Sequence, residues 1–228
     1  SFINMDLNIS KTVLGSKTAL KRLIILKGHL VPTLTVAQKY ADVTLDDISG
    51  DKLKSEIAHL APSHQDNILI AKQKFCEYQK MVKRSGWKLE KEIKIQGNVG
   101  KLWSNNDKKS GLNAILRRLE FNVPIKKAFE FFKDEIAFSK LNDNLKESKV
   151  VEDIGYDTSY VYHCFKGNLV VSDRDFSLFK HCFALPDGRF AIVSFSANHS
   201  KMPERKKKVR AHADLSVYLL SPQGDNKC

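Results

Sequence analysis

Three charged residues in succession, Asp173, Arg174 and Asp175, lie inside a largely apolar stretch, residues 170–185. An arginine keeps its proton in any protein environment, so a guanidinium in a core needs a carboxylate, carbonyl oxygens or a ligand as its partner. Two interpretations follow. Either Arg174 pairs locally or extends to water, or it contacts a polar group of a bound molecule. The surrounding residues leave both interpretations open.

No other set of residues predicts catalytic chemistry. Seven histidines are scattered along the chain, and the sequence contains no G-x-S-x-G, H-E-x-x-H or phosphate-loop motif. The four cysteines form no C-x-x-C pair and have no histidine at zinc-ligand spacing, so we expect reduced thiols and no cofactor. These patterns predict a protein that is not an enzyme.

The formal net charge of +12 favours acidic partners, which are nucleic acid, anionic lipid surfaces or an acidic protein. Nucleic-acid binding is disfavoured because the basic residues are not interleaved with aromatic ones. No run approaches the roughly 20 apolar residues of a membrane span, and no secretory signal is visible. We expect an intracellular protein, cytoplasmic or peripheral at membranes; the basic residues within 1–29 leave a mitochondrial location open.

The elements that must position these residues begin with helices. Residues 1–62 are predicted to form a helical N-terminal extension, and residues 63–228 a second, larger domain. Apolar residues at three- and four-residue steps predict a helix from Ser63, its N-cap, to Ser85, with Gly86 as its end.

After Gly86 the apolar residues alternate, which predicts strands over 87–96, 99–103 and 119–123, the last ended by Pro124. A broad apolar stripe that includes Phe129, Ile136 and Leu141 then predicts one helix from Ile125.

From residue 148 onward the pattern predicts only strands and turns. The strands are 149–154, 159–165, 170–185, 190–198 and 209–220, and Pro186-Asp187-Gly188-Arg189 is a tight hairpin turn. The order of elements predicts an α+β domain with a strongly curved antiparallel sheet.

Several motifs occur in an order that resembles the START domain, the StAR-related lipid-transfer family. They are Gly86-Trp87, the strand Val171-Ser172-Asp173-Arg174-Asp175-Phe176, Met202-Pro203-Glu204 and Val209-Arg210-Ala211. Residues 142–154, Gly155-Tyr156-Asp157-Thr158 and Gly167-Asn168-Leu169-Val170 are most similar to the sterol-carrying branch typified by the steroidogenic acute regulatory protein.

The resemblance implies a helix-grip fold, in which a curved antiparallel sheet wraps a long helix and encloses an apolar tunnel for one lipid. It also implies that Asp157 and Arg174 form an ion pair inside that tunnel, beside Val161, His163 and Phe176 as lipid-binding residues. The expected function is non-enzymatic lipid binding or transfer, with a sterol as ligand. The alternative is a START-like domain without ligand that serves as a structural subunit and binds a protein partner through residues 1–62.

The segment from Lys201 to Arg210 matches the family's loop beside the tunnel mouth. We expect it to dock on an anionic membrane, with Met202 as an apolar tip. The alternative is a solvated charged loop or a nuclear-localisation-like run. The basic docking residues are Lys201, Arg205, Lys206, Lys207 and Lys208.

The chain departs from the family pattern in two ways. Leu141 stands where the family commonly has a tryptophan. Family members also continue past residue 222 with further strands and a long C-terminal helix, whereas this sequence stops at Cys228. We therefore expect either a fragment, or a domain whose tunnel is open or is covered by the N-terminal extension or a partner.

Overall fold

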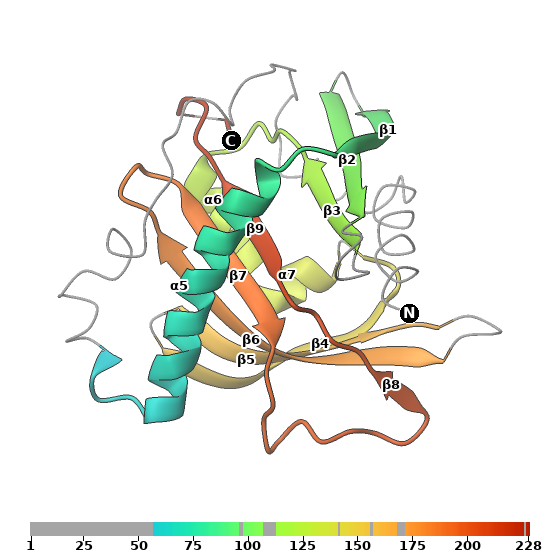
Figure 1. The fold of residues 1–228 in the computed structure, drawn as a ribbon. Coiled ribbons are helices and arrows are strands. Elements are labelled where there is room, and N and C mark those ends of the chain that lie inside the picture. The colour runs from blue at the N-terminus through green and yellow to red at the C-terminus, as the bar shows by residue number, and fades with distance from the viewer. Residues whose placement is uncertain are drawn as a thin grey trace. The chain divides into compact units, whose positions relative to one another are not determined.

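The computed structural model describes residues 57–95, 98–106, 113–140, 142–155, 157–167, 172–225 and 227–228. They fall into two compact units, the first containing residues 82–145 and 222–228 and the second containing 57–81 and 146–221. Figure 1 shows the elements of both. The predicted helical extension, 1–62, lies almost wholly outside the described residues.

The first unit contains a small antiparallel sheet in the order β1-β2-β3. Its strands are β1 (Lys88–Ile95), β2 (Asn98–Asn106) and β3 (Asn113–Arg118). The predicted third strand, 119–123, is wrong, because the strand that pairs with β2 is β3, which ends at Arg118. Strand β2 extends to Asn106, which lies opposite Asn113. Segment 119–123 instead meets the C-terminal residues, where the backbone N–H groups of Phe121 and Cys228 each donate to the other's carbonyl at 2.7 and 3.0 Å.

Two short helices replace the single predicted one. They are α6 (Ile125–Lys133) and α7 (Glu135–Ser139), with Asp134 between them in an extended conformation. The Asp134 carboxylate accepts hydrogen bonds from the backbone N–H groups of Ile136 and Ala137 at 2.8 and 3.3 Å. An aspartate that caps a new helix competes with continuation of the previous one. Ile136, predicted on the buried stripe, is 67% exposed.

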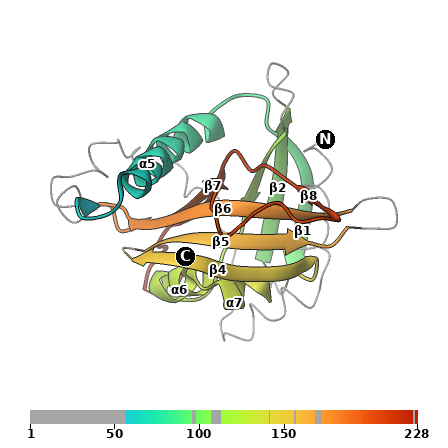
Figure 2. The ribbon, with the colours of Figure 1, turned by 90° about the horizontal axis from the view of Figure 1, so that it is seen from below.

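The second unit contains a larger sheet in the order β4-β5-β6-β7-β9, with β8 paired to β6. Figure 2 shows β4, β5 and β6 curving side by side. The predicted strands over 149–198 are confirmed with shifted bounds. The strands are β4 (Leu145–Gly155), β5 (Thr158–Phe165), β6 (Asp173–Ala184), β7 (Phe190–Ser196), β8 (Lys208–Arg210) and β9 (Ser216–Leu220).

The predicted strand 209–220 is wrong, because its two ends pair with different partners. Strand β8 runs parallel to the first residues of β6, and β9 runs antiparallel to β7. The turn between β6 and β7 is as predicted, with Gly188 at φ 82° and its N–H bonded to the Leu185 carbonyl at 3.0 Å. That φ lies in the left-handed region that glycine adopts without steric cost.

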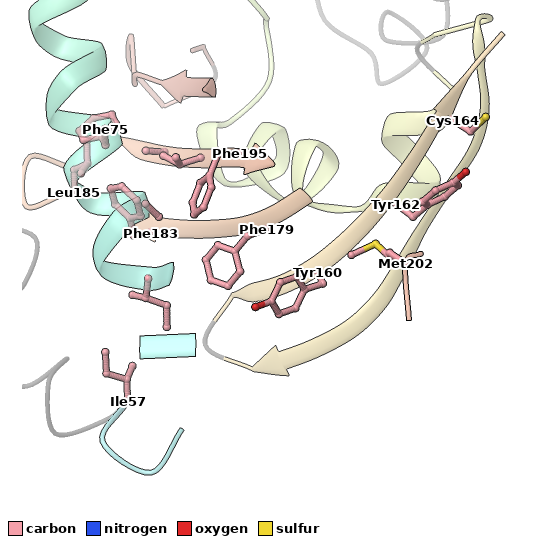
Figure 3. Packing of buried hydrophobic residues seen from close by; sticks show 14 residues of the cluster. Ile57, Phe75, Tyr160, Tyr162, Cys164, Phe179, Phe183, Leu185, Phe195 and Met202 are labelled. Carbon is pink, nitrogen blue, oxygen red and sulfur yellow. The ribbon is translucent and has the colours of Figure 1, made fainter. Parts of the chain in front are cut away.

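Helix α5 (Pro62–Val82) packs against one face of this sheet. It begins one residue before the predicted Ser63, at a proline, which suits the first turn of a helix. The Phe75 ring meets Phe183 edge to face at 5.4 Å between centroids, and Figure 3 shows this packing. The buried core here includes Ile68, Ala71, Phe75, Tyr160, Tyr162, Phe179, Phe183, Val193 and Phe195. None of the helices within the described residues has the length and apolarity to cross a bilayer.

Candidate functional site

Strands β5 and β6 present two faces, because successive side chains of a strand point to opposite sides of the sheet. Tyr160 and Tyr162 belong to the core under α5, so the residues between and beyond them point the other way. We call this second side the far face. The far face comprises Val161, His163 and Phe165 of β5 with their partners Leu178, Phe176 and Arg174 of β6.

Aromatic and aliphatic side chains dominate the far face. Val161 is fully buried, and Phe176 is buried as well. The Phe165 ring contacts Phe176 edge to face at 5.7 Å between centroids and approaches the His163 imidazole at 6.2 Å. The structure thus brings together the predicted residues Val161, His163 and Phe176. Phe165 was missed, although it continues the same two-residue alternation.

The predicted pair between Asp157 and Arg174 is wrong, because the two residues lie at opposite ends of the β5–β6 ladder. Asp157 precedes Thr158, which is paired with His181, whereas Arg174 is paired with Phe165. At about 3.3 Å per residue, the two ends of β5 are about 23 Å apart. The register of the strands fixes this separation, which is too long for an ion pair.

Each member of the supposed pair has its own surroundings. Asp157 is exposed in the turn between β4 and β5 at φ 56°, and its carbonyl accepts a hydrogen bond from the Cys182 N–H at 2.9 Å. Arg174 is half-buried, and its Nη1 donates to the Ser172 carbonyl at 3.1 Å. The local interpretation of Arg174 is therefore nearer the structure, with a carbonyl oxygen in place of an aspartate.

The most deeply buried charge in this stretch is Asp175, on the face toward α5. Its side chain is 1% exposed, and the Arg210 guanidinium binds it with Nε–Oδ1 and Nη2–Oδ2 distances of 3.0 and 3.2 Å. Hydrogen bonds to Asp175 raise the pKa of Arg210. The remaining guanidinium donors bind the carbonyls of Met202 and Pro203. This pair therefore ties the basic loop to β6.

Tyr162 joins the same buried network. Its hydroxyl donates to Asp175 Oδ2 at 3.1 Å and accepts from Lys208 Nζ at 3.2 Å. Burial raises the pKa of Tyr162 to about 12, with Asp175 also raising it and the hydrogen bond from Lys208 acting against both. The sequence analysis missed this network. The sequence signal that could have revealed it is the second aspartate of the triplet, Asp175. Because Asp175 directly follows Arg174 in the strand, its side chain points to the opposite face.

The basic loop differs from its predicted form at its apolar residue. Met202, predicted as a membrane-facing tip, is 4% exposed and belongs to the core cluster. Figure 3 shows it among the same side chains as Tyr160 and Tyr162. The exposed apolar side chain of this region is Val209, which β8 aligns with Arg174. Met202 is buried because Arg210 donates a hydrogen bond to its carbonyl and thereby holds this part of the loop against the sheet.

Four of the five predicted basic residues of this loop fall into two groups. Arg205 and Lys208 form ion pairs with Glu147 at 3.1 and 3.7 Å. Lys206 and Lys207 are exposed and, within the part of the chain that the structure describes, have no hydrogen bond or ion pair. Lys207 has φ 68°, so this residue forms a turn that directs the loop back into β8.

The start of the loop is fixed by His199. Its Nε2 lies 2.6 Å from Glu152 Oε2, its Nδ1 accepts the Lys201 backbone N–H at 3.2 Å, and its ring lies on Tyr160 at 4.4 Å between centroids. Because Nδ1 accepts, Nε2 carries the proton and donates to Glu152. The hydrogen bond with His199 is the main cause that lowers the pKa of Glu152. Lys201 Nζ also approaches Glu152, at 3.8 Å.

Comparison with known folds places these elements in a family. The profile of the START domain matches residues 74–228 of the chain. No protein among the curated sequences matches this chain significantly.

Solved structures share the fold at low sequence identity. Human STARD10 is 21% identical with a TM-score of 0.59 and covers 68% of this chain, which in turn spans only 63% of that structure. Human StAR-related lipid transfer protein 5 is 15% identical, with a TM-score of 0.58 and coverages of 76% and 78%. A STAR-related lipid transfer protein from Xanthomonas axonopodis is 20% identical, with a TM-score of 0.55 and coverages of 63% and 77%. The predicted α+β, START-like fold class is thereby confirmed, and the chain belongs to the START domain family.

Proposed function

We propose that the protein is a non-enzymatic intracellular lipid carrier that holds one lipid against the far face of β5 and β6. The observation that supports this most directly is the row formed by Val161, Phe176 and Phe165, with His163 opposite Phe176 and Arg174 opposite Phe165 at one end. An apolar surface with a few polar groups at one end is suited to a ligand with a long apolar body and a small head.

A sterol is the proposed ligand class. A sterol has one hydroxyl group, and Arg174 has several N–H donors, of which a single one is used among the described residues. The His163 imidazole, two residues from Phe165 on the same face, offers a second hydrogen-bonding group. We assign the lipid contacts to Val161, His163, Phe165, Arg174 and Phe176, and we leave Asp157 out because of its position at the other end of β5.

Docking on an anionic membrane is proposed for the basic loop. Its exposed cations are Lys201, which lies 3.8 Å from Glu152, and Lys206 and Lys207, and each such residue contributes about 1 kcal/mol near an anionic surface. Val209 takes the place of Met202 as the apolar contact of the loop. Since β8 aligns Val209 with Arg174, docking at this loop would bring the membrane next to the polar end of the far face.

The test is uptake of a fluorescent sterol from vesicles by the purified protein. We expect a saturating stoichiometry of one sterol per chain. Arg174→Ala should weaken uptake about tenfold, since a hydrogen bond to a charged donor is lost. Lys166→Ala, the same loss of charge at an exposed neighbouring position, should leave uptake unchanged. Absence of uptake for sterols and for every phospholipid tested would overturn the proposal.

That negative result, together with a stable complex that co-purifies with the chain, would support the structural-subunit alternative. Residues 1–62 are the proposed surface for such a partner. Deleting residues 1–56, which keeps the core residue Ile57 and all of α5, should then release the partner while the fold of the remaining chain is retained.

A further inference from the structure

Three cationic side chains converge on a single carboxylate on the surface of the second unit. Lys149 of β4 approaches Glu147 at 2.8 Å, and Arg205 and Lys208 of the basic loop approach it at 3.1 and 3.7 Å. Glu147 is partly exposed, with 31% of its side chain accessible. One negative charge therefore faces three positive ones at a site that water and solutes can reach.

The same three cations surround the Tyr162 ring. Arg205 lies 4.4 Å from the ring centroid, and Lys149 and Lys208 lie 5.5 and 5.6 Å from it. The ring is buried beneath them and is held from below by its hydrogen bond to Asp175. Contacts between cations and an aromatic face stabilise this clustering and limit the positions that the cations adopt. The site is therefore built before any ligand arrives.

The charges of this site do not balance. The hydrogen bond from Lys149 lowers the pKa of Glu147, and the charges of Arg205, Lys149 and Lys208 lower it further against the opposing effect of burial. Lys206 and Lys207 add two exposed cations directly between Arg205 and Lys208 in the sequence. Even with Glu147 ionised, the cluster retains excess positive charge.

We propose that Lys149, Arg205 and Lys208 bind the phosphomonoester group of an anionic membrane lipid, which takes the position that Glu147 occupies in its absence. A phosphomonoester carries about −1.5 to −2 charges at neutral pH, which neutralises three cations better than a single carboxylate does. Arg205 is suited to bind two phosphate oxygens at once. The lipid class that this site fits is a phosphoinositide with phosphorylated ring hydroxyls.

This inference rests on the proposed docking of the basic loop and adds a lipid class to it. The test measures binding of the full chain to vesicles that contain phosphatidylinositol bisphosphate or, at equal surface charge, phosphatidylserine. We expect tighter binding to the phosphoinositide vesicles. Equal binding to both vesicles would overturn head-group recognition and leave docking intact, whereas binding to neither would overturn docking and the inference together. Sterol uptake is measured separately and does not enter either result.

Two pairs of variants locate the site. Glu147→Gln removes the competing carboxylate and should tighten phosphoinositide binding about fivefold. Glu77→Gln, an equal change of net charge at an exposed position of α5, should have little effect. Arg205→Gln should weaken phosphoinositide binding about fivefold, whereas Lys80→Gln on α5 should not. Weaker binding by Glu147→Gln, or equal losses from Arg205→Gln and Lys80→Gln, would contradict the assignment.

Discussion

Arg210 of β8 and Asp175 of β6 lie opposite each other in a parallel register and form a two-point ion pair, with the Asp175 side chain 1% exposed. The Tyr162 hydroxyl completes the set of donors to this carboxylate. A buried carboxylate is tolerated only when its acceptor sites are filled, and here they are. The pair thus joins the basic loop to a central strand whose other face carries the proposed lipid contacts.

Removing one partner of this pair should leave an uncompensated buried charge. Arg210→Ala is expected to lower the free energy of unfolding by about 3 to 5 kcal/mol, measured by urea denaturation. Arg205→Ala is the matched control, because it breaks an exposed pair with Glu147, and it should cost less than about 1 kcal/mol. Similar losses for both variants would show that Asp175 is solvated in solution.

The extent to which the sequence predicted the fold depended on how local the signal was. Short apolar runs located β5, β6 and β7, and the Asp187-Gly188 turn located the hairpin between β6 and β7, because each of these signals lies within a few residues. The failures were non-local. The first residues of β6 extend beyond the end of β7, and β8 pairs with them there. No periodicity within residues 208–220 carries that information.

The candidate site was predicted in the same uneven manner. Val161, His163 and Phe176 were implied by the family resemblance, and the structure places them on one face of β5 and β6. The Asp157–Arg174 pair required the register between β5 and β6, which the sequence does not determine. Once that register is known, Asp175 emerges as the buried acid and Arg210 as its partner.

The position of Met202 can be tested through stability and membrane binding together. Met202→Ala should lower the free energy of unfolding by about 2 to 3 kcal/mol, because a buried side chain leaves a cavity, and should not change vesicle binding by the folded fraction. The exposed Val209, truncated to alanine, should change stability by less than about 0.5 kcal/mol. If Met202→Ala lost vesicle binding while its stability stayed unchanged, Met202 would contact the membrane as the apolar tip of the loop.

Packing of α5 on the sheet should depend on Phe75. This side chain is fully buried against Phe183, so Phe75→Ala should lower the free energy of unfolding by about 3 to 5 kcal/mol. Leu69→Ala, on the exposed side of the same helix, should cost less than about 0.5 kcal/mol beyond its effect on helix propensity. Urea denaturation followed by circular dichroism measures both, and equal costs would contradict the observed orientation of α5.

His181 should make stability depend on pH. Its side chain is buried, with Nδ1 2.8 Å from the Thr158 hydroxyl and Nε2 without a hydrogen-bond partner among the described residues. Burial, with a smaller contribution from the charge of Lys72, lowers the pKa of His181 from 6.5 to about 4, and the charge of Asp157 acts against both. Between these two pKa values the unfolded chain binds a proton that the folded protein does not, so stability falls as the pH falls.

The contribution of His181 should therefore be complete above pH 6.5 and should be lost progressively down to about pH 4, below which it levels off. The full loss is on the order of 3 kcal/mol, because each unit of pKa difference corresponds to about 1.4 kcal/mol. The measurement is the free energy of unfolding in urea across this pH range for the unsubstituted protein and for His181→Gln, whose side chain does not titrate. The difference between the two curves should grow as the pH rises from about 4 to 6.5. A parallel curve for His181→Gln would show that His181 is solvated in the folded protein.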